Sequence, residues 1–124
     1  MRKRVLTMRK RLLTAALLLT SLTGVAYADA RSDAKEQVEF GISVAQKGLW
    51  KEAIYRWERA TQIDPNYAAA FNDLAVAYEH EGMLEKAAEA YERALKLEPN
   101  NPMVRQNFEL FKEIHDRTTQ SQTP

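Results

Sequence analysis

The sequence contains no cysteine and has only four glycines, four prolines and two histidines among its 124 residues. Without cysteine, the chain cannot form a disulfide, a thiolate metal site or a cysteine nucleophile. It also contains neither a glycine-rich phosphate loop nor a Gly-x-Ser-x-Gly motif. His80 lacks the second histidine of a zinc-protease motif, since Leu84 stands in that place, and His115 has no companion ligand. We therefore predict no catalytic residue, no metal site and no cofactor.

The first 28 residues have the order of a secretory signal peptide. A basic head without acidic residues is followed by the apolar run Leu12–Val25 and by Ala26-Tyr27-Ala28, with small residues at both ends. This order predicts cleavage after Ala28 and export of a bacterial protein to the periplasm or the medium. The alternative is an uncleaved inner-membrane anchor, although the run is shorter than the roughly 20 residues of a membrane span. Met8 is an alternative start, because three basic residues still follow it.

The predicted export segment conceals the charge of the rest of the chain. The whole sequence has 18 basic and 17 acidic residues, and six of the basic ones lie within residues 1–28. The remaining chain therefore has 12 basic and 17 acidic residues, a net charge of −5. Because an acidic domain repels phosphate backbones, we predict no nucleic-acid partner.

In the remaining chain one sequence pattern recurs at a fixed period, and this period is the number of residues that separate Gly48 from Gly82. The segment GLWKEAIYRWERATQIDPN (48–66) aligns without a gap with GMLEKAAEAYERALKLEPN (82–100). Glu58-Arg59-Ala60 falls on Glu92-Arg93-Ala94, and Pro65 falls on Pro99. A fixed period of this length is typical of solenoid proteins, in which each unit packs on the next.

Each unit has the pattern of two helices. In the second unit the first apolar stripe has the i, i+3, i+4, i+7 spacing of one helix face and consists of Phe71, Leu74, Ala75 and Tyr78. The second stripe consists of Ala87, Tyr91, Ala94 and Leu95. Gly82 separates the two helices, and Pro99 ends the second. Asn101 and Pro102 then have the N-cap and first-turn preferences of a further helix.

On these residues the sequence resembles the tetratricopeptide repeat (TPR) family. The second unit supplies the family positions Phe71, Leu74, Ala75, Tyr78, Gly82, Leu84, Ala87, Tyr91, Ala94 and Pro99. The first unit supplies Phe40, Gly41, Gly48, Trp50, Ala53, Trp57, Ala60 and Pro65. It departs from the pattern at Gln37 and Val44, where larger residues are usual. The resemblance implies an all-α fold, a short right-handed α-solenoid of two helix-turn-helix repeats with a C-terminal capping helix.

The resemblance and the composition together divide the chain into six parts. They are a signal peptide (1–28), a linker (29–33), a first repeat (34–67), a second repeat (68–101), a capping helix (102–117) and a disordered tail (118–124). Residues 102–117 begin like a third repeat, but Glu109 and Lys112 stand where a partner helix requires apolar or small residues. Val104, Phe108 and Phe111 are expected to dock this helix on the second repeat.

The two tryptophans are interpreted as core residues rather than as a ligand site. Trp50 and Trp57 follow one helical stripe, and both fall on large core positions of the repeat. We expect partial exposure of Trp50, because it lies next to the turn at Gly48.

The resemblance implies that the first helix of each repeat lines a concave binding face. Carried over by position, the candidate partner-binding residues are Lys35, Val38, Glu39, Ile42, Gln46, Asn72, Asp73, Val76, Glu79, Gln106 and Asn107, with Ala69, His80, Met103 and Leu110 beside them. An apolar seam flanked by Glu39, Asp73 and Glu79 favours a partner segment with basic residues. The alternative is that these positions form an ordinary solvated face. The Lys/Asn/Arg clamp that some family members use for carboxylates is absent.

The predicted function is therefore non-catalytic binding of a protein or peptide partner in the cell envelope. Two alternatives stay open at this point. One is self-association into a homo-oligomer, because two repeats form a small core and three or more are usual. The other is an accessory factor of a larger envelope complex.

Overall fold

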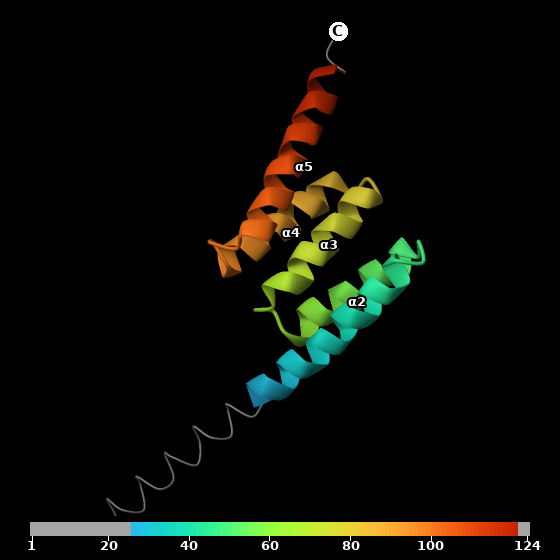
Figure 1. The fold of residues 1–124 in the computed structure, drawn as a ribbon, viewed down its shortest axis with the longest axis vertical. Helices are drawn as coiled ribbons and strands as arrows, with labels where there is room; N and C mark the ends of the chain where they lie inside the picture. The colour runs from blue at the N-terminus through green and yellow to red at the C-terminus, as the bar shows by residue number, and fades with distance from the viewer. Residues whose placement is uncertain (1–25, 122–124) are drawn as a thin grey trace, which may run out of the picture.

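A computed structural model of the chain describes residues 26–121. The basic head and the apolar run of the predicted signal peptide lie outside the described residues, as do residues 122–124. Five helices connected by short turns make up the described chain (Figure 1). An N-terminal helix covers residues 26–45, and it is followed by α2 (Trp50–Ile63), α3 (Ala68–His80), α4 (Leu84–Leu97) and α5 (Pro102–Ser121). Between residues 26 and 121 there is no β-strand, so the all-α prediction is confirmed.

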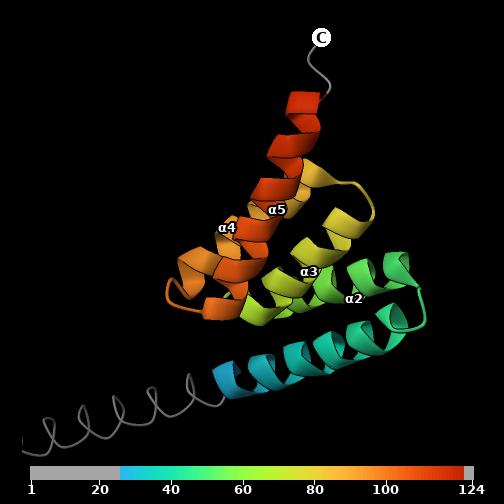
Figure 2. The same cartoon turned by 45° about the horizontal axis from the view of Figure 1, so that its top comes forward.

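Consecutive helices pack side by side in antiparallel pairs. The central helix α3 packs against both α2 and α4 and also contacts α5, while α5 packs on α4. Figure 2 shows the N-terminal helix alongside α2 at one end of the stack and α5 at the other end. The architecture is a short solenoid of two helical hairpins and a last helix.

The turns within the two hairpins share a left-handed glycine and the same closing hydrogen bond. Gly48 and Gly82 have φ angles of 77° and 73°, in the left-handed region that favours glycine. After the first helix, Leu49 N–H donates to the Val44 carbonyl at 3.0 Å; in the second hairpin Met83 N–H donates to the Tyr78 carbonyl at 2.8 Å. These closures are Schellman motifs, which satisfy carbonyl groups at the helix end.

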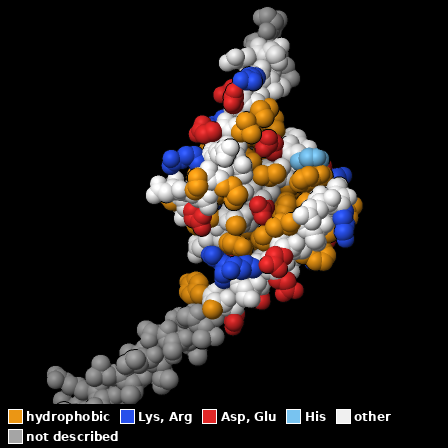
Figure 3. All heavy atoms as spheres, in the orientation of Figure 1, with side chains coloured by type: hydrophobic (Ala, Val, Ile, Leu, Met, Phe, Trp, Pro, Cys, Tyr) orange, Lys and Arg blue, Asp and Glu red, His pale blue; other side chains and the backbone are white. Residues whose placement is uncertain are grey.

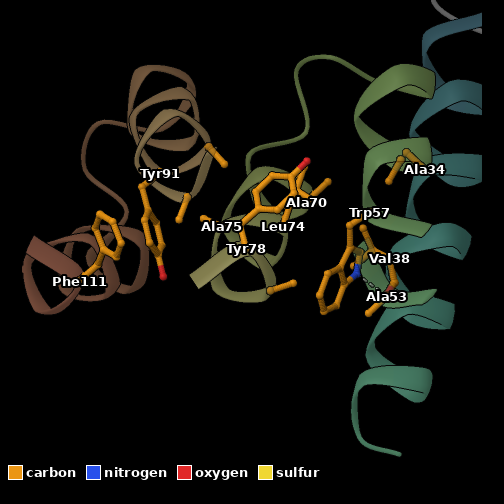
Figure 4. Packing of buried hydrophobic residues seen from close by; sticks show 14 of the residues in the cluster. Ala34, Val38, Ala53, Trp57, Ala70, Leu74, Ala75, Tyr78, Tyr91 and Phe111 are labelled. Carbon is orange, nitrogen blue, oxygen red and sulfur yellow. Dashed lines mark hydrogen bonds between the residues drawn. The ribbon is translucent and has the colours of Figure 1, made fainter. Parts of the chain in front are cut away.

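The core lies between the helices and combines alanines with a few large rings. Ala53, Ala60, Ala87 and Ala94 are fully buried, and their small side chains let the helices approach closely. Trp57 and Tyr91, at equivalent positions of the two repeats, fill the remaining space (Figure 4). The predicted core position of Trp57 is confirmed, since only 4% of this residue is exposed.

The last helix docks as the sequence predicts. Val104 and Phe111 are buried, and the Phe108 and Phe111 rings lie 5.6 and 5.5 Å from the ring of Tyr91. The Asn101 side chain accepts hydrogen bonds from the N–H groups of residues 103 and 104 at 3.0 and 3.3 Å, which confirms the predicted N-cap.

The helices extend beyond two of the predicted boundaries. Residues 29–33 were expected to form a linker, but they belong to the N-terminal helix. Arg31 explains the difference, because it forms an ion pair with Asp64 and lies over the ring of Tyr67 at 4.6 Å.

At the C-terminal end, α5 continues to Ser121, whereas the sequence predicted disorder from residue 118. The hydroxyl groups of Thr118 and Thr119 donate to carbonyls one turn earlier, at 2.9 and 3.0 Å. The hydroxyl groups thus find their hydrogen-bond acceptors within the helix, so these polar side chains are compatible with a helical backbone.

Candidate functional site

A pocket of about 330 Å³ opens between the N-terminal helix, α2 and α3. Its volume is at the small end of the range for ligand sites, so it suits one side chain better than a large ligand. It is lined by Ile42, Ala45, Gln46, Trp50, Trp57, Asp73 and Val76.

The two tryptophans have different roles in this pocket. Trp57 donates its indole N–H to the Val38 carbonyl at 3.1 Å, as Figure 4 shows, and presents little of its surface. Trp50 is half-buried, and its ring stacks on the imidazole of His80 with the centroids 4.1 Å apart. The stack fixes a partly accessible indole at the pocket wall, which agrees with the expected partial exposure of Trp50.

Asp73 is the charged group of the pocket, and no cation from the described residues pairs with it. Its carboxylate accepts a long hydrogen bond of 3.4 Å from Asn72. Within residues 26–121 no Lys, Arg or His nitrogen lies within ion-pair distance of Asp73. Burial raises the pKa of Asp73 to about 6, and the hydrogen bond from Asn72 only partly offsets this effect.

Side-chain hydrogen bonds connect the site to the neighbouring helices. Asn107 of α5 donates to the Asn72 side chain at 3.1 Å, which joins α5 to the residue beside Asp73. Tyr91 of α4 donates its hydroxyl to Glu79 of α3 at 3.1 Å. Burial and the negative charge of Glu79 raise the pKa of Tyr91, so this phenol stays protonated as a donor.

The structure brings some of the predicted partner-binding residues together in one pocket and buries others in the interior. Ile42, Gln46, Asp73 and Val76 share the pocket. Val38 and Asn72 are 5% and 2% exposed, so their side chains belong to the interior instead of to a surface. The other predicted residues are exposed or half-buried outside this pocket, and they are Lys35, Glu39, Glu79, Gln106 and Asn107.

An apolar row crosses the first helices of successive units. Ile42, Val76 and Leu110 occupy the same position in three units, and Ile42 and Leu110 are 41% and 55% exposed. Met103 and Ile114, also on α5, are 53% and 51% exposed. Figure 3 shows hydrophobic side chains gathered over the middle of the molecule, with acidic side chains among them.

Sequence reasoning did not place the tryptophans in a site. Trp50 and Trp57 were interpreted only as core, yet both reach the pocket from α2. The position of Trp50 directly after the Gly48 turn was the available signal, because this turn brings the start of α2 beside the end of the preceding helix. Its stacking partner His80 belongs to the next repeat and is not detectable in the local pattern.

A second pocket, of about 300 Å³, lies between α3 and α4 and differs in its charges. Its lining includes Lys86, Glu89 and Arg93. Arg93 lies over the Phe71 ring at 5.6 Å and Lys86 over the Tyr78 ring at 5.5 Å. The rings of this pocket therefore already have cations from the chain itself.

Among residues 26–121, no group of three or more His, Asp and Glu residues is arranged to hold a metal ion. None of the helices in this range combines the length and apolar character that crossing a membrane requires.

Comparison with known protein families agrees with this architecture. Residues 68–101 match the tetratricopeptide repeat model, and residues 44–82 match a second model described as a TPR repeat. Residues 44–101 are thus similar to tetratricopeptide repeats, a type of repeat that generally mediates protein–protein interaction. Among curated proteins, no sequence matches significantly.

A solved structure with the same architecture comes from Plasmodium falciparum. It is the C-terminal TPR-containing domain of a protein assigned as FK506-binding, and it aligns with a TM-score of 0.58 at 24% identity. The alignment covers 84% of the present chain and 64% of that chain. At this identity the similarity supports the TPR solenoid fold alone.

Proposed function

We propose that this chain is a non-catalytic binding module that holds a segment of a partner protein across the first helices of its repeats. The observation that carries the proposal is the row of Ile42, Val76 and Leu110, which continues across three helices beside the pocket at Asp73. Exposed apolar side chains at a fixed spacing offer an extended segment several equivalent contacts. Glu39 and Asp73, at equivalent positions of the two units, favour basic residues in that segment.

The proposed location is the cell envelope, after export and cleavage behind Ala28. The pattern of residues 1–28 supports export. Residues 26–29 are exposed, and within the described part of the chain the first side chain with an ion pair to a later helix end is that of Arg31. Cleavage before Asp29 therefore leaves the packing of the first repeat intact. N-terminal sequencing of the exported product is expected to begin at Asp29, whereas a start at Met1 or Met8 contradicts cleavage.

The binding proposal is tested by removing the apolar row. Tagged protein with Ile42→Ser and Leu110→Ser is expected to lose a partner that the wild-type protein captures from envelope extract, because both exposed contacts disappear. The matched control carries Leu49→Ser and Tyr55→Ser, two exposed apolar residues outside the row, which are 54% and 56% exposed in the wild-type chain. Proteins that both variants capture equally well do not bind through the row. If no protein distinguishes the two variants, the proposal fails.

Light scattering of the same preparations separates partner binding from self-association. A dimer that the Ile42→Ser, Leu110→Ser variant abolishes would show that the row binds a second copy. A monomer in both variants is the expected result.

A further inference from the structure

The aromatic rings of this protein differ in whether the chain supplies a cation to them. Several rings on or near the surface have a Lys or Arg of the chain over them, and the pairs are Arg31–Tyr67, Arg56–Phe40, Arg56–Tyr55, Lys86–Tyr78, Arg93–Phe71 and Lys112–Phe108. Across residues 26–121 no Lys or Arg lies over Trp50 or Trp57, and the ring that stacks on Trp50 is the imidazole of His80. Tryptophan is nevertheless the ring with the strongest attraction for cations.

The same contrast holds for the carboxylates that are withdrawn from solvent. Asp64 is buried but forms an ion pair with Arg31, and it also accepts the N–H of Asn66 at 3.0 Å. Asp73 is half-buried, and in the described chain it has no cationic partner. A desolvated carboxylate without a counter-ion is unfavourable, and a ligand that brings the counter-ion removes this cost.

The unpaired carboxylate and the two indoles line one pocket. Asp73 reaches it from α3, and Trp50 and Trp57 reach it from α2. Ile42 and Val76 provide apolar walls, and Gln46 adds an amide at the rim. A volume of about 330 Å³ accommodates a single long side chain. Negative charge, aromatic faces and apolar walls in one cavity are complementary to an organic cation with an apolar stem.

We propose that this pocket binds the guanidinium group of an arginine in the partner segment, with Asp73 as its counter-ion and Trp50 as its stacking surface. Arginine fits better than lysine, because its planar group pairs with a carboxylate through two N–H donors and stacks on an indole at the same time. The pocket adjoins the row of Ile42, Val76 and Leu110, so one extended segment can contact both. This inference rests on the proposed binding function and names the residue that the partner must contribute.

The two tryptophans of the chain both line the pocket, so their fluorescence reports its occupancy. The probe is the blocked tripeptide Ala-Arg-Ala, and its control is Ala-citrulline-Ala, which has nearly the same shape without the charge. At pH 8 the arginine peptide is expected to change the tryptophan emission and to bind about tenfold or more tightly than the citrulline peptide, the usual effect of a hydrogen-bonded charge pair. Equal responses to the two peptides, or no response to either, would overturn the proposal.

Variants locate the binding site without removing the fold. Asp73→Asn keeps the shape of the side chain and is expected to weaken the arginine peptide about tenfold or more. The matched control Asp116→Asn removes the same charge from an exposed position of α5 and is expected to stay within about twofold, because exposed charges are screened. Trp50→Phe keeps an aromatic ring and is expected to abolish most of the emission change. An Asp73→Asn protein that binds as well as the Asp116→Asn protein contradicts the assignment.

The outcome also separates this inference from the proposed function. If the arginine peptide fails to bind while the Ile42→Ser, Leu110→Ser variant still loses its partner, the apolar row binds a segment and the cation pocket is wrong. If that variant keeps every captured protein, the proposed function fails, and the peptide titration alone then decides whether the pocket binds guanidinium.

Discussion

The first and second repeats share most of the backbone hydrogen bonds at their turns and helix ends but fill their interiors differently. Asp64 N–H donates to the Ala60 carbonyl at 2.9 Å, and Glu98 N–H, at the equivalent position of the second repeat, donates to the Ala94 carbonyl at 2.9 Å. The two glycine turns correspond in the same way. The large ring between the helices, however, is Trp57 in the first repeat and Tyr91 in the second.

The size of each ring determines whether glycine or alanine fits at the small-residue position of the same repeat. A Cβ atom at Gly41 would lie 2.4 Å from Nε1 of Trp57, so only glycine fits beside this indole. The equivalent residue in the second repeat is Ala75, which is fully buried in the core that also contains the smaller ring of Tyr91. The comparison shows that the repeat specifies a volume shared by two positions rather than a residue at each one.

The largest expected effect comes from disturbing this shared volume. Gly41→Ala is expected to lower the free energy of unfolding by about 3 kcal/mol, because the new methyl group overlaps a buried indole. Adding Trp57→Tyr recreates the pair of the second repeat and is expected to restore part of that loss. Urea denaturation followed by circular dichroism measures both. A double variant no more stable than Gly41→Ala would refute the equivalence of the two pairs.

Asp73 and Glu39, at equivalent positions of the two repeats, provide the second test. Because the pKa of folded Asp73 is about 6 and its ordinary value is 3.8, the unfolded chain loses this proton first as the pH rises. The wild-type protein is therefore expected to lose stability between about pH 4 and pH 6 through this group. Asp73→Asn removes that loss and should raise the free energy of unfolding at pH 8 by about 2 kcal/mol, less than the full pKa difference corresponds to, because half-buried Asp73 keeps some contact with solvent.

The control for this effect is Glu39→Gln, because Glu39 is exposed. Its substitution is expected to change the free energy of unfolding by less than about 0.5 kcal/mol at any pH. If Asp73→Asn and Glu39→Gln change the free energy of unfolding equally between pH 4 and pH 8, burial of the Asp73 carboxylate does not destabilise the folded protein.

The smallest expected effect concerns the junctions that follow the two repeats. Asn101 caps α5, whereas the equivalent Tyr67 makes no side-chain cap for α3. Asn101→Ala is expected to lower the free energy of unfolding by about 1 kcal/mol, and Asn101→Asp, which keeps the accepting oxygen, by much less. Asn100→Ala, at the exposed neighbouring residue, is the control. Thermal unfolding measures the series, and equal losses at residues 100 and 101 would exclude a capping role.

Much of the fold was predictable, because its signals are local. The fixed repeat period, the glycines at the turns and Pro99 each act on backbone geometry within a short stretch of chain. The helix boundaries beyond the repeats were less predictable. Arg31 makes residues 29–33 part of the N-terminal helix through a contact with Asp64, which lies at the far end of α2.

The candidate site was predictable only in part, for the same reason. Repeat position put Ile42, Asp73 and Val76 on one face, and these three residues line one pocket. It also assigned Val38 and Asn72 to that face, although both are buried. Helix periodicity predicts only approximately in which direction a side chain points. The packing of the neighbouring helices then decides how much of that side chain is exposed.

The sequence alone determined that this protein is an all-α chain of two tetratricopeptide repeats with a capping helix, because periodic apolar residues and turn glycines act locally. Only the tertiary structure decided that Asp73 lacks a counter-ion while Asp64 has one, and that Trp50 stacks on His80 beside a pocket. Burial and charge pairing depend on side chains that several different helices bring together, so a single stretch of sequence does not contain them.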